Sequence, residues 1–229
     1  NDVARGPSAA PAASCNSMLT LAPWNPHWEC FAKEPTCKTG AVSALETLLG
    51  QPYGIKADFF SVIEFEVDTY VPPAPYALIG NFQSCGHDWA TLIYNNDTWA
   101  LASTPIVGCL AAGRSFAAAT FTRRDAAAGA ELAVVAAHFP QTQHNASAYA
   151  EATASLRGAL QKLGPAAMTA VLADTNTESP SAAAASAWHN TSGGVNRTNA
   201  ELLRDLGLWS SATAPPAAKL FPGCCCTPF

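Results

Sequence analysis

The sequence predicts a mixed α/β sandwich. Several short strands are mostly joined to a neighbour by a short turn, and two helices separate strands that lie far apart in the chain. A parallel doubly wound sheet would show a stricter alternation of strands and helices. With 229 residues, 49% of them apolar, the chain can form one large domain or two small ones around a substantial core.

The N-terminal half predicts two strands and a helix. Met18–Ala22 is a short apolar run that leads to Asn25, in a turn bracketed by prolines. Apolar residues recur at helical spacing over Thr39–Leu49 and a glycine follows, which predicts a helix. Ala57–Glu66 is mostly apolar and aromatic, so we expect a buried strand that delivers the carboxylate of Glu64.

The middle of the chain predicts further strands joined by turns. Tyr70–Tyr76 is rich in proline and indicates a loop. Trp89–Tyr94 and Trp99–Ala102, separated by an Asn-Asn-Asp turn, predict a hairpin. Ser115–Thr122 and Glu131–Ala137 predict two more strands that a short turn connects.

The C-terminal part of the chain contains a predicted strand that ends in polar residues, and these residues indicate a functional site. Ser147–Leu163 predicts a helix and Asn199–Leu206 a shorter one. Between them, the apolar run of Ala170–Glu178 breaks at Asp174 and Asn176, which share a face if the strand continues. A carboxylate holds a hard cation or a water, and a carboxamide donates to a phosphoryl oxygen. A polar turn after a buried strand is the alternative interpretation. Other predicted strands also end near chemically useful residues, which are Asn25, Glu64, Asp88 and His138.

Cysteines and glycosylation sequons together predict a secreted, extracellular protein. The four sequons begin at Asn96, Asn145, Asn190 and Asn196. The eight cysteines lack the spacing of a zinc site, so disulfides are expected. Cys30 and Cys37 are one candidate pair, and Cys85 and Cys109, which flank the predicted hairpin, are another. The pairing of the other four stays open; these are Cys15, Cys224, Cys225 and Cys226.

The charge of the chain bears on its partners. A net charge of −5, from 12 Lys and Arg against 17 Asp and Glu, argues against binding nucleic acid through a broad basic face. It does not exclude an enzyme that reaches phosphate through a metal and a few arginines. The sequence has no run of about 18 apolar residues, so we expect no membrane span.

The ordered set of strand ends resembles the endonuclease/exonuclease/phosphatase superfamily, and its secreted deoxyribonuclease I branch in particular. The matching motifs run from the first strand to the last, over about residues 18–229: Leu-Ala-Pro-Trp-Asn25, the apolar run that ends at Glu64, Gly-Arg114-Ser-Phe, Val-Val-Ala-Ala-His138-Phe-Pro and Asp174-Thr-Asn176. Asp88 matches by position more than by motif. The resemblance implies a four-layer, deoxyribonuclease I-like fold, with two sheets between outer helices and a site on one rim.

The resemblance also implies metal-dependent hydrolysis of a phosphodiester and a role for each site residue. Glu64 and Asn25 would ligate the metal, expected to be Mg²⁺ or Mn²⁺, and a structural Ca²⁺ is a further candidate. His138, oriented by Asp88, would exchange a proton with the phosphate or the leaving oxygen. The remaining roles are phosphate binding by Arg114, Asn25 and Asn176, and positioning of the attacking water by Asp174.

Two functions follow as expectations. The first is a secreted, metal-dependent phosphodiester hydrolase, an endonuclease on DNA, with RNA or a phospholipid head group as other substrates. The alternative is a secreted glycoprotein that uses the same fold for binding or structure without catalysis.

The domain organisation leaves one question about the C-terminus. We expect a flexible tail over residues 1–17 and a single domain over residues 18–229 that is incomplete at its end. Family members carry a Ser-Asp-His motif near their C-terminus, and this sequence has no histidine after His189. One interpretation is that a separate C-terminal fragment completes the site and is attached by a disulfide to one of the cysteines 224–226. The other is that the protein is a truncated relative without catalysis. The start at Asn1 without Met fits the removal of a signal peptide.

Overall fold

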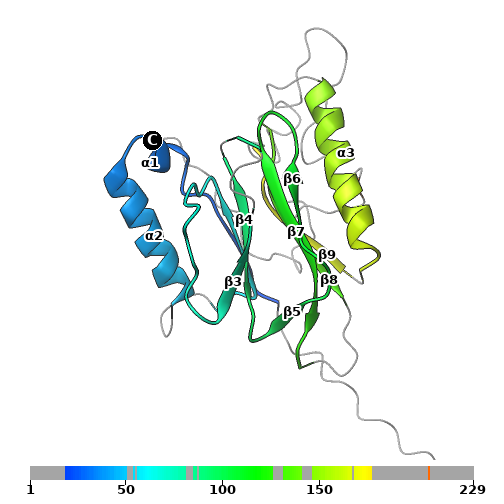
Figure 1. Cartoon of the computed structure of the whole chain (residues 1–229), viewed down its shortest axis with the longest axis horizontal. Coiled ribbons are helices and arrows are strands. Elements are labelled where there is room, and N and C mark those ends of the chain that lie inside the picture. The colour runs from blue at the N-terminus through cyan, green and yellow to red at the C-terminus, as the bar shows by residue number, and fades with distance from the viewer. Residues whose placement is uncertain are drawn as a thin grey trace, which may run out of the picture.

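The described part of the chain forms nine strands in two sheets that pack face to face (Figure 1). The computed structural model describes residues 19–50, 54, 56–80, 85–86, 88–125, 131–140, 146–166, 168–176 and 206. The first sheet has the order β1 (Leu21–Trp24), β2 (Phe59–Ile63), β4 (Ala90–Asn95) and β3 (Tyr76–Ile79). The second has the order β5 (Trp99–Leu101), β7 (Ser115–Arg123), β8 (Leu132–His138) and β9 (Met168–Asp174), with β6 (Ile106–Cys109) also paired to β7.

The strand directions bring several strand ends to one rim of the sandwich. β1 pairs with β2 in parallel, and β8 pairs with β9 in parallel, so within each pair the carboxyl ends meet. β4 is antiparallel to β2, and β7 is antiparallel to β8, so the starts of β4 and β7 lie at the same rim. The side chains that follow or precede these ends are those that the sequence singled out.

Side-chain alternation along the strands builds the layer between the sheets. In β2, Phe59 and Ile63 pack between the sheets, whereas Phe60 and Val62 face the outer layer. The middle residue, Ser61, donates a buried hydrogen bond to the backbone oxygen of Leu172 in β9 at 3.0 Å, which ties the two sheets together. The inner face of β8 alternates with its outer face in the same way.

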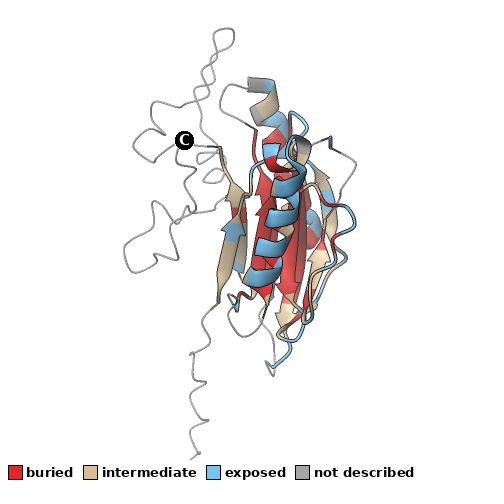
Figure 2. Ribbon diagram, turned by 90° about the vertical axis from the view of Figure 1, so that its left-hand side faces the viewer, coloured by how far each residue is buried: buried red, intermediate tan, exposed pale blue. Residues whose placement is uncertain are grey.

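Helices cover the outer face of each sheet. The helices are α1 (Glu29–Ala32), α2 (Pro35–Leu49) and α3 (Ala146–Leu163). Leu45 and Leu49 of α2 are buried with Phe60 in the outer cluster of the first sheet. Figure 2 shows α2 with its outward residues exposed and a largely buried sheet behind it. Leu156 of α3 packs in the same way against the second sheet, beside Val135. The expected two-sheet sandwich flanked by helices is confirmed.

The predicted hairpin is wrong, because β4 and β5 belong to different sheets. Asn95 Oδ1 accepts hydrogen bonds from the backbone N–H of Asp97 and Thr98, at 3.0 and 3.3 Å, in a turn that carries the chain from the first sheet to the second. Trp99 follows, buried between the sheets with its ring 5.1 Å from that of Phe59. The burial of Trp99 between the sheets therefore stabilises this arrangement more than local pairing of the two segments would stabilise a hairpin.

Other expectations differ in their bounds or extent. The helix predicted over Thr39–Leu49 begins at Pro35, a residue favoured in the first turn of a helix, rather than at Thr39. β3 and β6 were not expected, and Tyr76 begins β3 rather than ending a loop. The helix expected over Asn199–Leu206 lies outside the described residues except for Leu206.

Two predicted disulfides are confirmed. Cys30 is bonded to Cys37, and Cys85 is bonded to Cys109. The other four cysteines lie outside the described residues. Within the described chain, no helix has the length and apolar character needed to cross a bilayer.

Candidate active site

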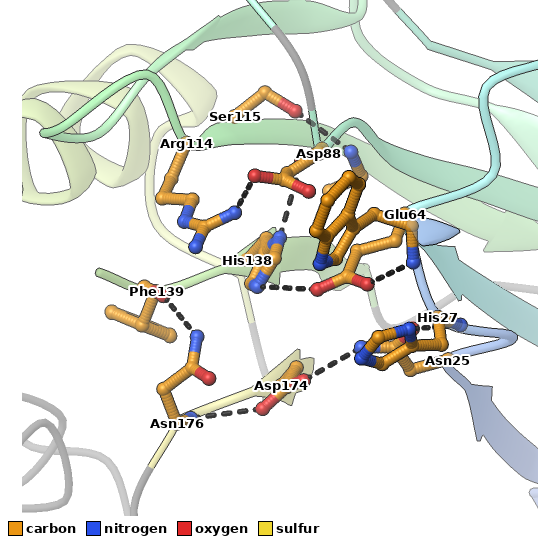
Figure 3. Close-up of polar contacts among 12 residues, drawn as sticks. Asn25, His27, Glu64, Asp88, Arg114, Ser115, His138, Phe139, Asp174 and Asn176 are labelled. Atoms are coloured by element: carbon orange, nitrogen blue, oxygen red, sulfur yellow. Dashed lines mark hydrogen bonds and ion pairs between the residues drawn. The ribbon is translucent and has the colours of Figure 1, made fainter. Parts of the chain in front are cut away.

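Polar residues from four strand ends meet at one rim, at the mouth of the layer between the sheets (Figure 3). His138 is the last residue of β8 and Asp174 the last of β9, and the two are partners in the parallel register. Both continue the inner face of their strands, because Ala136 and Leu172, two residues earlier, pack between the sheets. Asn25 follows β1 on the same side, and its Nδ2 donates to Asp174 Oδ2 at 2.8 Å.

Glu64 reaches this cluster through an unusual backbone conformation. Strict alternation after Ile63, which faces inward, would send Glu64 to the outer face of the first sheet. Glu64 instead has φ +59°, in the left-handed region that a residue with a side chain seldom adopts. The break in alternation turns its carboxylate inward, where Oε1 lies 3.4 Å from His138 Nε2. Backbone strain of this kind is often found at functional sites.

The side chains of Glu64, His138 and Asp174 form a cluster able to hold a metal. One ligand atom of each lies within 4.8 Å of the others. His138 has no exposed surface and Glu64 is only 6% exposed, whereas Asp174 is partly exposed at the rim.

His138 presents a lone pair to this cluster. Burial, and after it the positive charge of Arg114, lowers the pKa of His138, which is therefore neutral at physiological pH. Nδ1 lies 3.1 Å from the backbone oxygen of Asp88, an acceptor only, so the ring proton is assigned to Nδ1. Nε2 is then an acceptor, and it has no hydrogen-bond partner among the described residues, since its 3.4 Å contact with Glu64 joins two acceptors.

The carboxylate of Glu64 is also an acceptor that faces another acceptor, because its Oε1 lies against His138 Nε2. Burial raises the pKa of Glu64, and the charge of Asp174 adds to this, while hydrogen bonds from the backbone N–H of Trp28 and from Asn25 oppose it. Two carboxylates and an imidazole lone pair thus face one another in a poorly solvated space. A divalent cation neutralises such a set of acceptors, so the residues present fit a metal.

Arg114 and Asp88 flank the cluster as a pair. Arg114 stands before β7 and Asp88 before β4, and Nη1 of the guanidinium bonds to Oδ2 of the carboxylate. The sequence-based expectation differs in one contact: Asp88 meets His138 through its backbone oxygen, and its carboxylate is turned to Arg114. Asp88 has φ +64°, and Glu66 Oε1 accepts from its backbone N–H at 2.9 Å. Arg114 lies close enough for its positive charge to act on His138.

Asn176 closes the site on the side of the second sheet. Asp174 Oδ1 accepts from the backbone N–H of Asn176 at 2.8 Å, and Asn176 Nδ2 donates to the backbone oxygen of Phe139 at 2.6 Å. The left-handed φ of +46° at Asn176 allows this tight turn. All seven expected site residues thus lie at one rim: Asn25, Glu64, Asp88, Arg114, His138, Asp174 and Asn176.

Sequence reasoning missed two supporting residues. The backbone N–H of Trp28 donates to Glu64 Oε2, and the carboxylate of Glu66 holds Asp88. Glu66 lies within the predicted strand, but only the turn after Ile63 brings it to the rim. Among the sequons, Asn96 is exposed in the turn after β4, and its Oδ1 accepts from Arg124 Nη2 at 3.0 Å. Asn145, Asn190 and Asn196 lie outside the described residues.

Comparison with solved structures finds matches to this fold. The human Nocturnin catalytic domain matches with 16% identity and a TM-score of 0.49, over 70% of this chain and 65% of that domain. A Bacteroides vulgatus endonuclease/exonuclease/phosphatase matches with 16% identity and a TM-score of 0.49, over 76% of this chain and 71% of that one. Humanised TDP2 of D. rerio matches with 16% identity and a TM-score of 0.47, over 72% and 65% of the two chains. No protein-family model and no curated protein sequence matches this chain.

Proposed function

We propose that the protein is a secreted, divalent-metal-dependent phosphodiester hydrolase that cleaves DNA as an endonuclease. The observation that carries this proposal is the convergence of Glu64, His138 and Asp174 within 4.8 Å. A structural ion pair satisfies an acceptor with a donor, whereas Glu64 Oε1 and His138 Nε2 face each other as two acceptors at 3.4 Å, with the carboxylate of Asp174 beside them. A divalent cation held by these residues would remove that cost and would supply the Lewis-acid chemistry that phosphodiester hydrolysis uses.

Glu64 and Asn25 are the proposed metal ligands, because their oxygen atoms suit Mg²⁺ or Mn²⁺. A bound cation would neutralise charge that develops on the phosphate. Asp174 positions the attacking water, since its carboxylate is fixed by hydrogen bonds from Asn25 and Asn176. The ring of His138, held through Nδ1 by the backbone oxygen of Asp88, has an unprotonated Nε2. It accepts there, by way of a phosphate oxygen, the proton that the attacking water gives up, and returns it to the leaving oxygen.

Arg114 and the two asparagines of the site would bind the phosphate groups of the substrate. Arg114 binds a flanking phosphate with the planar guanidinium that Asp88 orients. Asn25 and Asn176 contact phosphoryl oxygens without adding a second negative charge. Secretion is supported by the two disulfides and by the exposed sequon at Asn96.

The test is cleavage of a supercoiled plasmid by the purified protein in Mg²⁺ and, separately, in EDTA. We expect nicked and linear products in Mg²⁺ and intact plasmid in EDTA. Glu64→Gln should abolish cleavage while the folded state persists by circular dichroism. A wild-type protein that binds Mg²⁺ but leaves plasmid, RNA and phospholipid intact would favour the non-catalytic glycoprotein instead.

A further inference from the structure

Trp28 exposes a large aromatic side chain beside the proposed active site. Its side chain is 38% exposed, and it is the one aromatic residue among the exposed large apolar side chains of the described chain. An indole in water is costly, and isolated exposed tryptophans are enriched at surfaces that bind partners or ligands.

The backbone of Trp28 is fixed directly to the site. Its N–H donates to Glu64 Oε2, and its carbonyl oxygen accepts from the N–H of Phe31 at 3.0 Å in the turn that starts α1. Phe31 in turn packs edge-on against Phe65, with ring centroids 5.4 Å apart. The root of the indole is therefore held in place before any ligand arrives, which lowers the entropic cost of binding on it.

Lys33 and His27 both lie near the indole. The ammonium of Lys33 lies 4.7 Å from the ring centroid, a cation–π contact, and also bonds to Glu29 Oε1 at 2.5 Å. The ring of His27 also lies near the indole, with ring centroids 6.2 Å apart and planes inclined by 30°. An aromatic surface next to a lysine suits a ligand with both a flat ring and a phosphate.

We propose that Trp28, with Lys33 beside it, is a stacking platform for an unpaired nucleobase of the strand whose phosphate enters the active site. This rests on the proposed function and names its substrate class as a nucleic acid with at least one base free of pairing. Stacking on an aromatic side chain tolerates any base, because every base has a π face. The platform would therefore add affinity without strong sequence preference. Because the chain has a net charge of −5, electrostatic attraction to phosphates is weak, and stacking would supply part of the affinity in its place.

The test is binding of a fluorescently labelled single-stranded oligonucleotide, followed by anisotropy in EDTA so that no metal-dependent turnover intervenes. Stacking is worth about 1–3 kcal/mol per base, so Trp28→Leu should weaken binding about 5- to 150-fold. Trp28→Phe keeps a ring and should stay within a few-fold of the wild type. An abasic strand of equal length should bind the wild type and both variants alike. Leu101→Ala, at an exposed apolar residue of β5, is the control and should change nothing.

Three results would overturn the platform. The first is Trp28→Leu binding the oligonucleotide as tightly as the wild type does. The second is an equal loss for the base-containing and the abasic strand, which would assign Trp28 a structural role. The third is wild-type binding to phosphatidylcholine vesicles that Trp28→Leu abolishes while oligonucleotide binding persists, which would indicate a lipid substrate. Plasmid cleavage by the wild type is scored separately, so failure of the proposed function is distinguishable from failure of the platform.

Discussion

Glu64→Gln should reverse the effect of metal on stability. In the wild type, the Glu64 carboxylate faces the lone pair of His138 at 3.4 Å and carries an unfavourable buried charge. A glutamine amide at this position can donate to His138 Nε2 while its oxygen keeps the bond from Trp28. One net hydrogen bond is worth about 1 kcal/mol, so in EDTA the variant should be more stable than the wild type by about that amount.

Metal should reverse the order. At a Mg²⁺ concentration 100 times Kd, a ligand that binds the folded state alone stabilises it by about 2.7 kcal/mol. For a domain of this size, that corresponds to a rise in Tm of about 5–11 °C. The assay is thermal unfolding of both proteins in EDTA and across a Mg²⁺ titration. The wild-type Tm should climb past that of the variant, whose Tm should remain nearly flat.

Glu131→Gln is the matched control, because it makes the same chemical change at an exposed residue that precedes β8, the strand His138 ends. It should respond to Mg²⁺ as the wild type does. An equal rise in Tm for the wild type and Glu64→Gln would refute the argument that Glu64 holds the metal.

Three further predictions follow from burial and site geometry. His138→Ala should lower the rate of plasmid cleavage about 10²- to 10⁴-fold, measured in saturating Mg²⁺, and a change of less than threefold would remove its proton-transfer role. Burial raises the pKa of Tyr70 from 10.0 to about 12, so the folded state keeps this proton longer than the unfolded state, and the free energy of unfolding should fall as the pH rises from about 10 to about 12. Tyr70→Phe should lose that part of the alkaline decline in urea unfolding at each pH; an unchanged decline would contradict the assignment. Leu156→Ala should cost about 2–5 kcal/mol in urea unfolding, because the leucine of α3 is fully buried against the second sheet, and a cost below 1 kcal/mol would mean that α3 packs loosely.

Strand ends were predictable from the sequence because an abrupt change from apolar to polar residues marks them. The run that ends at His138 and the run that ends at Asp174 each stop at a polar residue, and the structure pairs these two residues across β8 and β9. In the structure, both side chains continue the inner face of their strands, two residues after Ala136 and Leu172. The gathering of these ends at one rim was predicted by the superfamily resemblance, because local patterns alone do not say which strand ends meet.

Features that depend on tertiary packing were not predictable. Trp99 begins a strand of the other sheet because its ring fills the layer between the sheets, and no local pattern distinguishes that from a hairpin. The left-handed backbone of Glu64 inverts the face its side chain would otherwise occupy. The carboxylate of Asp88 turns to Arg114, a choice between two partners that only their positions in space decide.

The hydrogen bond between Asn25 and Asp174 joins residues 149 positions apart in the chain. Asn25 follows β1, and Asp174 is the last residue of β9. Among the described strands, β1 and β9 each lie at an edge of their sheet. Contacts of such long sequence separation form late, after the local antiparallel pairs have closed the shorter loops. A metal ion that needs both edge strands in place would not speed folding. It would instead slow unfolding, so bound metal would lengthen the lifetime of the native state and leave the folding rate nearly unchanged.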